Sequence, residues 1–378
     1  MNITRLCTDM VGYKLQHFCG VPKKLPMNLT ISVTDRCNSR CKTCNIWRKD
    51  AVDELDVEEY EKIFRSLSKA PVWFTLSGGE PFLRSDIVDI SESIYRNNEP
   101  NIINIPTNGI LTDRIEKSVR EILDICKKTM VVVNLSLDGI GEDHDVIRGA
   151  KSFDKLLDTF ERLSCLRDSH SNFTLGIHSV ISSYNVSKLQ YIFDYVRNEL
   201  SPDSYITEIA EERVELGTVG AGITPNTEEY RAAIEFISGE LKKVSHREMF
   251  PNIIKSLRLT YYDVVKDILV EKRQIIPCYA GISSGQITPT GDVWMCCVRG
   301  ESIGNLRGAD YDFKRVWFSE SAKVQRASIK NGECYCPLAN AHYTSMIFSP
   351  GAMMRVSRYL IRELILKGKG HQHHFKKR

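Results

Sequence analysis

The stretch "SVTDRCNSRCKTCNIW", residues 32–47, places three of the chain's twelve cysteines within eight positions. Cys37, Cys41 and Cys44 follow the spacing C-x3-C-x2-C. Three thiolates on one tight loop can ligate three irons of a [4Fe-4S] cube, which leaves the fourth iron without a protein ligand. A structural zinc site is the alternative, and it would need a fourth cysteine or histidine close by. The nearest upstream candidates, His17 and Cys19, are separated from the loop by a predicted strand.

The composition around this loop is that of an ordinary globular protein, with 42% hydrophobic and 26% charged residues. A length of 378 residues favours one large domain with a smaller one. The N-terminal stretch is interrupted by charges every few residues, and no run approaches the roughly 20 apolar residues of a membrane span. We therefore expect an intracellular, cytoplasmic protein, in which clustered cysteines more often bind metal than form disulfides.

Short β-rich runs alternate with longer helical patterns from about residue 27 onward. The helical runs, such as 56–70 and 152–167, repeat apolar residues at intervals of three and four. Six successive βα units predict an α/β fold with a partial (βα)6 parallel barrel. In such folds the loops after the strands build the active site, and the cysteine loop directly follows the first strand. The predicted strands are 28–33, 72–77, 102–107, 131–137, 173–181 and 204–210.

The pattern changes after the sixth strand. Residues 224–272 are mostly helical in pattern, and residues 281–306 have the pattern of a β-hairpin that turns at Pro289, Thr290 and Gly291. The hairpin predicts a small C-terminal unit packed against the barrel. We expect an N-terminal amphipathic segment, a barrel core, a helical connector, a hairpin-containing iron-sulfur unit, and a basic amphipathic helix with its tail. Their predicted ranges are 1–26, 27–220, 221–272, 273–345 and 346–378.

The cysteine loop resembles the cluster loop of the radical S-adenosylmethionine (radical SAM) enzymes. The resemblance implies that the open iron binds the amino and carboxylate groups of S-adenosylmethionine. It also implies that an electron from the cluster cleaves the sulfonium, and that a 5'-deoxyadenosyl radical removes hydrogen from a substrate. Many members have an aromatic residue before the third cysteine, where this chain has Thr43, so adenine contact is weakened and iron ligation is not. Trp47 either supplies that aromatic surface or packs against the barrel.

The motif "SGGEP" follows the second predicted strand. Its glycines let the backbone approach a ligand closely. The resemblance assigns the motif to the methionyl amino group of S-adenosylmethionine, with Glu80 as the side chain closest to that role. An ordinary turn is the alternative. The four candidate residues are Gly78, Gly79, Glu80 and Pro81.

Two further strand ends and one helix agree with the resemblance. Thr107 and Asn108 offer hydrogen-bonding groups after the third strand, although an Asn-Gly turn would also explain them. Ser136 and Asp138 lie two apart at the end of the fourth strand, hence on one face, and both can bond ribose hydroxyls. Arg148 resembles the family's basic residue near the carboxylate of S-adenosylmethionine, and a surface salt bridge is its alternative.

A second group of cysteines lies in the C-terminal unit, where C-x12-G-x4-C resembles the opening of SPASM and twitch auxiliary-cluster domains. The hairpin brings Cys296 back toward Cys278, and adjacent strand residues face opposite ways, so Cys297 is not expected to ligate the same cluster. Cys334 and Cys336 would complete a four-thiolate set with no open iron. The tight C-x-C pair leaves open whether Cys297 replaces one of them, and a zinc ribbon is the alternative site.

Both ends of the chain have amphipathic helical patterns. The helix predicted at 352–366 carries arginines on one face, and the basic tail "KGKGHQHHFKKR" follows it. Such a helix suits an anionic membrane surface. The alternative is that both terminal helices pack on the barrel. The apolar positions are Ile3, Leu6, Met10, Val11, Leu15 and Phe18 in the first helix, and Met353, Val356, Leu360, Ile361, Leu364 and Ile365 in the last.

The leading hypothesis is a radical SAM enzyme that oxidises an alcohol-bearing glycan, lipid or small molecule, because one auxiliary cluster can accept the second electron. A SPASM-type peptide maturase is the alternative in the same class, and a non-catalytic iron-sulfur or zinc protein is the alternative in another. The expected partners are a substrate, an electron donor such as a ferredoxin or flavodoxin, and peripheral membrane contact, but no nucleic acid. The sequence identifies neither the substrate nor a catalytic side chain.

Overall fold

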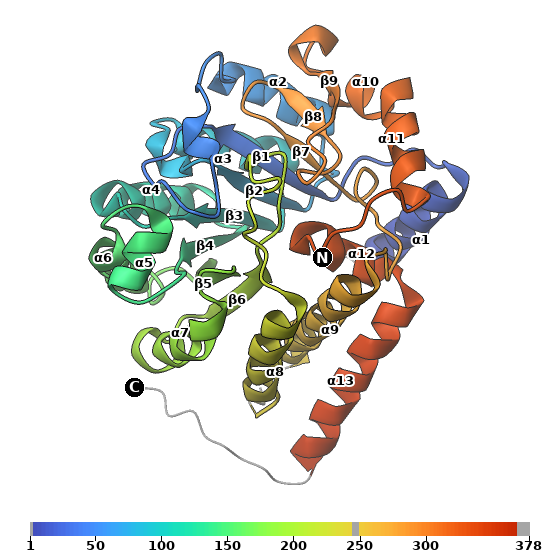
Figure 1. Ribbon diagram of the computed structural model, residues 1–378. Helices are drawn as coiled ribbons and strands as arrows, with labels where there is room; N and C mark the ends of the chain where they lie inside the picture. The colour runs from blue at the N-terminus through green and yellow to red at the C-terminus, as the bar shows by residue number, and fades with distance from the viewer. Residues whose placement is uncertain (1–2, 244–248, 369–378) are drawn as a thin grey trace.

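The computed structural model of the chain describes residues 3–243 and 249–368. One nine-stranded sheet forms its centre, in the order β6-β5-β4-β3-β2-β1-β7-β8-β9 (Figure 1). The first six strands pair in parallel, which confirms the predicted partial barrel, and each differs from its predicted range by at most one residue at either end. They are β1 (Asn28–Thr34), β2 (Trp73–Gly78), β3 (Ile102–Thr107), β4 (Met130–Ser136), β5 (Phe173–Ile181) and β6 (Ser204–Ile209).

Helices follow these strands and cover the outer face of the sheet (Figure 1). They are α2 (Val57–Leu67), α3 (Ile87–Asn98), α4 (Thr112–Ile125), α5 (Glu142–Arg148), α6 (Phe153–Ser164) and α7 (Leu189–Tyr195). Asp56 begins α2 with a capping box, since its side chain accepts from Glu59 N and the Glu59 side chain accepts from Asp56 N. The helical segment predicted after β6 contains α8 (Thr227–Lys243) and α9 (Met249–Glu271), which pack together beside the β6 edge.

The two faces of the barrel sheet differ in polarity. Alternate strand residues such as Ile31, Leu76 and Val133 are fully buried against the helices in one apolar cluster. The residues between them face the concave side and are largely polar; Asn134 there donates to Asn104 Oδ1 at 2.8 Å. Because successive strand side chains alternate between faces, the apolar set packs the core and leaves the polar set for a ligand.

The C-terminal strands extend the barrel sheet instead of forming a separate one. β7 (Ser284–Ile287) pairs in parallel with β1, and the predicted hairpin is confirmed by its antiparallel pairing with β8 (Asp292–Trp294). β9 (Ser302–Asn305) then pairs with β8. The sequence analysis did not predict the β1–β7 pairing, because it joins segments about 250 residues apart and no local pattern records it. The remaining helices here are α10 (Phe313–Trp317), α11 (Glu320–Lys330) and α12 (Ala339–Phe348).

The terminal helices α1 (Ile3–Cys19) and α13 (Pro350–Gly368) lie at the same side of the molecule as α12 (Figure 1). Only part of the predicted apolar face of α1 packs. Met10 is half-buried against the cluster that contains Tyr279 and Phe348, while Val11, Leu15 and Phe18 remain exposed. Tyr13 and His17 are buried against Phe348 and Tyr279. The side chains of Ile3, Leu6, Leu364 and Ile365, and the tail from residue 369, lie outside the description.

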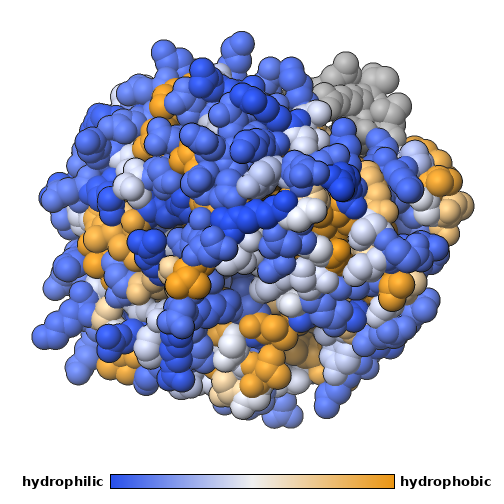
Figure 2. Space-filling model, turned by 90° about the horizontal axis from the view of Figure 1, so that it is seen from above, coloured by the Kyte–Doolittle hydropathy of each residue, from blue (hydrophilic) through white to orange (hydrophobic). Residues whose placement is uncertain are grey.

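The surface seen from above is mainly hydrophilic, with separate hydrophobic patches (Figure 2). None of the helices in the described part of the chain is both long enough and apolar enough to cross a membrane. On α13, Val356 is buried, Met353 and Leu360 are half-buried, and Ile361 is exposed. Most of the predicted apolar positions that are described on this helix therefore pack against the protein.

Candidate functional site

The cysteine loop, residues 35–45, leaves the end of β1 and packs closely against the motif after β2. The amide N–H groups of Gly79 and Glu80 donate to the carbonyls of Thr34 and Arg36, at 2.7 and 2.8 Å. A Cβ atom added at Gly79 would come within 2.0 Å of the Arg36 carbonyl oxygen. Glycine at this position therefore permits the close backbone approach that seats the cysteine loop.

The other side of the cysteine loop is fixed by the end of α5 and by the segment after β6. Arg40 and Lys42 donate their amides to the carbonyls of Arg148 and Ile147, at 3.0 and 2.8 Å. The Asn45 amide donates to Leu216 O at 2.8 Å, and Asn45 Nδ2 donates to Gly217 O at 2.9 Å. Backbone hydrogen bonds from three segments therefore hold one short loop in place.

The three thiols of the cysteine loop are half-buried and close enough to perturb one another. The pKa of Cys37 is raised to about 11 and that of Cys44 to about 12, mainly by burial and in smaller part by the neighbouring thiols. Arg148 is the cation beside them, because its Nη1 donates to Cys41 Sγ at 3.7 Å. The loop thus offers three sulfur donors and little positive charge to compensate them, which suits a cationic metal cluster. These residues therefore fit the predicted [4Fe-4S] cluster.

Glu80 is fully buried, and its carboxylate is turned toward the end of β3. It accepts hydrogen bonds from Thr107 Oγ1 at 2.8 Å, from the Asn108 amide at 2.8 Å and from the Phe82 amide at 3.2 Å. Burial raises its pKa to about 7, although these hydrogen bonds oppose the shift. The side chain thus joins two strand ends, and the backbone of the motif is the part presented to the cysteine loop.

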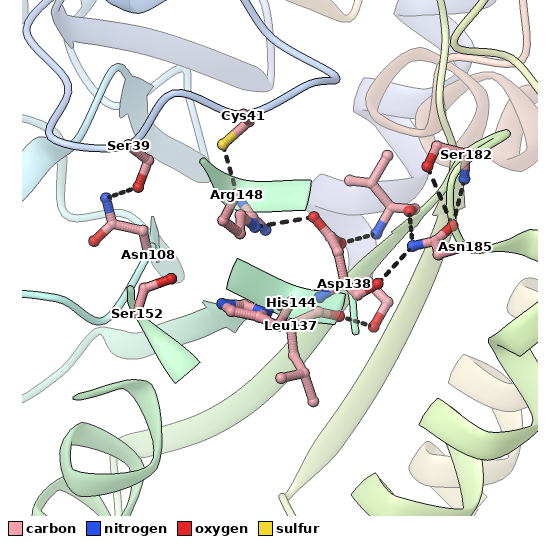
Figure 3. Close-up of polar contacts among 12 residues, drawn as sticks. Ser39, Cys41, Asn108, Leu137, Asp138, His144, Arg148, Ser152, Ser182 and Asn185 are labelled. Carbon is pink, nitrogen blue, oxygen red and sulfur yellow. Dashed lines mark hydrogen bonds and ion pairs between the residues drawn. The ribbon is translucent and has the colours of Figure 1, made fainter. Parts of the chain in front are cut away.

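Asn108 continues this network into the cysteine loop. Its Nδ2 donates to Asn38 Oδ1 at 2.7 Å and to Ser39 Oγ at 3.0 Å, and the second of these contacts is visible in Figure 3. Asn38 and Ser39 were not singled out from the sequence, because polar residues between ligating cysteines carry no periodic signal. The structure brings the predicted β2, β3 and cysteine-loop residues into one connected group.

Asp138 and Arg148 form a buried pair beside the cysteine loop (Figure 3). Arg148 Nε lies 2.9 Å from Asp138 Oδ2, and the two side chains are 13% and 2% exposed. Asp138 Oδ1 accepts from the Val180 amide at 2.8 Å, and its own amide donates to His144 Nδ1 at 3.4 Å. Arg148 is therefore placed at the cysteines in a buried ion pair, and both oxygens of Asp138 already have partners within the protein.

The remaining predicted contacts vary in exposure. Ser136 is half-buried at the end of β4, where it pairs in register with His178. Thr43 is buried at 8% exposure. Trp47 donates its indole N–H to Cys44 O at 3.1 Å, and the guanidinium groups of Arg40 and Arg48 lie 5.5 and 4.8 Å from its ring centroid. Trp47 is thus held by its own loop and by two arginines.

Four cysteines of the C-terminal unit line one small cavity of about 20 Å³. We call it the four-cysteine cavity; its thiols belong to Cys278, Cys296, Cys334 and Cys336. Its other walls are mostly apolar and include Ile276, Ile329 and Ala341. Burial raises the pKa of Cys278 to about 11. Four sulfur donors around one apolar cavity fit a fully ligated iron-sulfur cluster.

Cys297 does not line that cavity. It is 7% exposed, and Arg213 Nη1 donates to its Sγ at 3.8 Å. Cys296 and Cys297 both follow the end of β8 at Trp294, so strand alternation does not govern their orientation. All cysteines whose side chains are described are free thiols. Within residues 3–243 and 249–368, no group of three or more Cys, His, Asp or Glu side chains is preformed around a single metal position.

A charged group on β6 and the segment after it was missed by the sequence analysis. Glu208 lies 3.6 Å from His178 Nε2, and Glu211 Oε2 lies 3.2 Å from Arg213 Nε. Glu215 accepts from Ser32 Oγ at 3.2 Å and from the Gln286 side chain. The sequence does contain a sign of this group. The stretch "EIAEERVELG", which begins near the end of β6, carries four acidic residues in eight positions.

Comparison with known proteins agrees with this architecture. Residues 31–180 match the family described as the radical SAM superfamily. The Fe-coproporphyrin III synthase of Methanosarcina barkeri is 27% identical over 82% of this chain and 77% of its own length. The antilisterial bacteriocin subtilosin biosynthesis protein AlbA of Bacillus subtilis is 22% identical over 84% and 69%. Streptococcus suis SuiB bound to precursor peptide SuiA shares the fold, with a TM-score of 0.62, 16% identity, and coverage of 85% and 71%.

Proposed function

We propose that this chain, which belongs to the radical SAM superfamily, uses two iron-sulfur clusters to carry out a two-electron oxidation of a peptide substrate. The observation that carries the proposal is the difference between the two cysteine sets. The cysteine loop offers three thiols, whereas the four-cysteine cavity offers four. Three thiols leave one iron open for S-adenosylmethionine, and four leave none.

The residues around the cysteine loop are suited to hold S-adenosylmethionine next to that open iron. Gly78 and Gly79 bring the backbone after β2 against the loop, and Ser136 presents a hydroxyl at the end of β4. Arg148 supplies a positive charge beside Cys41 for the carboxylate. When bound, the cluster and S-adenosylmethionine together supply reductive sulfonium cleavage and hydrogen removal from substrate.

The four-cysteine cavity is placed to hold a cluster that accepts an electron. Removing a hydrogen atom takes one electron from the substrate, and a two-electron oxidation needs an acceptor for the second. A cluster with every iron ligated by protein has no position for substrate, so electron acceptance is its remaining use. The first reduction needs an external donor, for which a ferredoxin or flavodoxin is suited.

A peptide is the substrate class that the comparisons support best. AlbA is named for the biosynthesis of a bacteriocin, and the SuiB structure contains a precursor peptide; each likeness extends over more than four fifths of this chain. The sequence alone favoured an alcohol-bearing glycan, lipid or small molecule. Because the likenesses to AlbA and to SuiB both point to a peptide, we place the peptide first.

A tetrapyrrole is the second candidate, because the Fe-coproporphyrin III synthase is the relative with 27% identity over most of the chain. Coproporphyrin carries carboxylates on its side chains. The concave side of β6 and the segment after it present Glu208, Glu211 and Glu215 next to Arg213. An excess of buried acids disfavours a polycarboxylate ligand there, because like charges repel strongly in a desolvated site.

One anaerobic experiment tests the proposed function. The protein is reconstituted with iron and sulfide, and we expect roughly eight irons per chain. With S-adenosylmethionine and a reductant it should release 5'-deoxyadenosine. Cys37→Ala should lose about half of the iron and all of the nucleoside, whereas Cys278→Ala should lose about half of the iron and still release nucleoside.

The matched control is Cys165→Ala, because Cys165 is an exposed thiol on the outer helices. It should retain full iron content and full nucleoside release. A wild-type protein that binds zinc and produces no 5'-deoxyadenosine would contradict the proposal. Mass spectrometry of candidate peptides, searching for a loss of about two hydrogen masses, then separates the peptide from the tetrapyrrole candidate.

A further inference from the structure

The segment between β6 and α8 connects the two cysteine sets directly. Near one end, Leu216 O accepts from the amide of Asn45, the residue after Cys44. One residue earlier, the Glu215 amide donates to Cys297 O at 3.3 Å, and Cys297 is the residue after Cys296. Residues 210–216 therefore lie between the cysteine loop and the four-cysteine cavity. A substrate that reacts at the cysteine loop and passes an electron to a cluster in the cavity is best placed beside this segment.

Three carboxylates point into this region, and Glu211 is the least completely bonded of them. Glu208 is paired with His178, and Glu215 is hydrogen-bonded to Ser32 and Gln286. The Glu211 side chain is 3% exposed; its Oε2 forms an ion pair with Arg213 at 3.2 Å, and its Oε1 has no hydrogen-bond partner. Buried polar atoms almost always have partners, so the unpartnered Oε1 marks an acceptor that a ligand can fill.

Arg213 is the cation next to Glu211, and it is also incompletely bonded. Its Nε lies 3.2 Å from Glu211 Oε2 without forming a hydrogen bond, and its side chain is 20% exposed. The only hydrogen bond found for its side chain in the described part of the chain is the long one to the Cys297 thiol. The site therefore offers an acceptor and a donor side by side, both with unused capacity.

We infer that Glu211 and Arg213 bind the backbone of the peptide substrate, with Glu211 accepting from the N–H and Arg213 donating to the C=O of one extended residue. This inference rests on the proposed function and names the part of the substrate that is recognised. The N–H and C=O of one residue in an extended chain point to the same side, as in a hydrogen-bonded strand pair. An amine alone would bind Glu211 but would be repelled by Arg213. A carboxylate alone would bind Arg213 but would be repelled by Glu211.

The electrostatics of the pair agree with this geometry. The pKa of Glu211 is raised to about 7, mainly by burial; Arg213 opposes this rise, and the nearby Glu208 and Glu215 add to it. The carboxylate is thus poorly stabilised in the free protein. A hydrogen-bond donor on the substrate would stabilise the Glu211 carboxylate. Binding groups often lower the stability of the free protein in this way until the ligand is bound.

The test uses the reconstituted full-length protein and the paired variant Glu211→Leu with Arg213→Met, which keeps the volume and removes both polar groups. The probe is a random-sequence heptapeptide mixture, and retained peptides are measured by mass spectrometry. We expect wild-type retention to exceed that of the variant about tenfold, since the two lost hydrogen bonds together change affinity by roughly that factor. We also expect the variant to melt no lower than the wild type.

Glu212→Gln is the matched control, because Glu212 is the next carboxylate on the same segment and bonds the amides of Gly220 and Gly222 away from this pair. It should retain peptides as well as the wild type does. A melting temperature about 5 °C or more lower in the paired variant would show a structural ion pair and overturn the inference.

The two proposals fail separately. If the wild type releases 5'-deoxyadenosine but retains peptides no better than the paired variant, the backbone-binding pair is wrong and the proposed function stands. If retention differs as expected but no 5'-deoxyadenosine is released, the pair stands and the proposed function is wrong. Retention restricted to hydroxyl-rich peptides, and unaffected by N-methylation of their backbone, would also overturn the inference.

Discussion

Arg307 forms a two-pronged ion pair with Glu59, with Nε 2.6 Å from Oε1 and Nη2 2.9 Å from Oε2. Glu59 lies in the first turn of α2 in the barrel, and Arg307 follows β9 in the C-terminal unit. The same carboxylate accepts from Tyr311 Oη at 2.9 Å and closes the capping box with Asp56. One side chain therefore begins a barrel helix and also joins the two units.

Glu59→Gln should weaken this connection in a pH-dependent way. Hydrogen bonds from Arg307 lower the pKa of Glu59 to about 2, below its ordinary value of 4.5. The stabilisation is then complete above pH 4.5 and is lost as the pH falls toward 2. We expect the wild type to exceed the variant by about 1 kcal/mol in free energy of unfolding at pH 7. Urea unfolding at pH 7, 4 and 3 measures it, and a constant difference would contradict the assignment.

Arg148→Met should destabilise the protein strongly, because it leaves the Asp138 carboxylate buried without its counter-ion. Removing one partner of a buried pair costs about 3 to 5 kcal/mol. Denaturant unfolding of the metal-free protein measures the loss. Adding Asp138→Asn to the same chain should restore part of it. Arg162→Met is the control, since that guanidinium is 41% exposed and its loss should change the stability far less.

Gly79→Ala should displace the cysteine loop, because the added methyl group would meet the Arg36 carbonyl oxygen at 2.0 Å. We expect a loss of about 2 kcal/mol in stability and a clear loss of iron from this site only. Iron analysis with electron paramagnetic resonance measures both clusters separately. Gly239→Ala in α8 meets no atom within 4 Å and should be neutral or slightly stabilising. Equal iron contents in the two variants would refute the steric argument.

Cys297→Ala should keep its full iron content, whereas Cys296→Ala should lose the auxiliary cluster. The reason is orientation, since Cys296 lines the four-cysteine cavity and Cys297 faces Arg213. Iron and sulfide analysis after reconstitution measures the difference, which we expect to be about four irons per chain. The opposite result would show that Cys297 replaces one of the four proposed ligands.

The local parts of this structure were predictable from the sequence. Strands such as 102–107 and 173–181 were placed correctly because each is a short apolar run bounded by turn residues. The approach of Cys296 to Cys278 was expected from hairpin geometry, and Cys334 and Cys336 were expected only as the residues that complete a set of four thiols. Non-local relationships were not predictable. The β1–β7 pairing depends on edges that meet only in the folded chain, and no spacing in sequence states it.

The candidate site was likewise predictable only in its local parts. The sequence singled out the motif residues that the fold brings together around the cysteine loop. It did not predict the buried pairing of Asp138 with Arg148, because a sequence does not record which carboxylate turns inward. The packing face of α1 was predicted only in part, for a related reason; Met10 packs as expected, but Val11, Leu15 and Phe18 do not. Tyr13 and His17 are amphipathic, and their rings bury well against Phe348 and Tyr279 although an apolar pattern passes over them.

The position of β1 between β2 and β7 has a consequence for electron movement. β1 carries the cysteine loop at its end. On its other side β1 is hydrogen-bonded to β7, the first strand of the hairpin that leads to Cys296. Electron tunnelling rates depend steeply on the separation of donor and acceptor. A shared hydrogen-bond ladder acts as a spacer between the two cysteine sets, so with clusters bound at both, thermal motion of the outer helices would leave the tunnelling distance nearly constant.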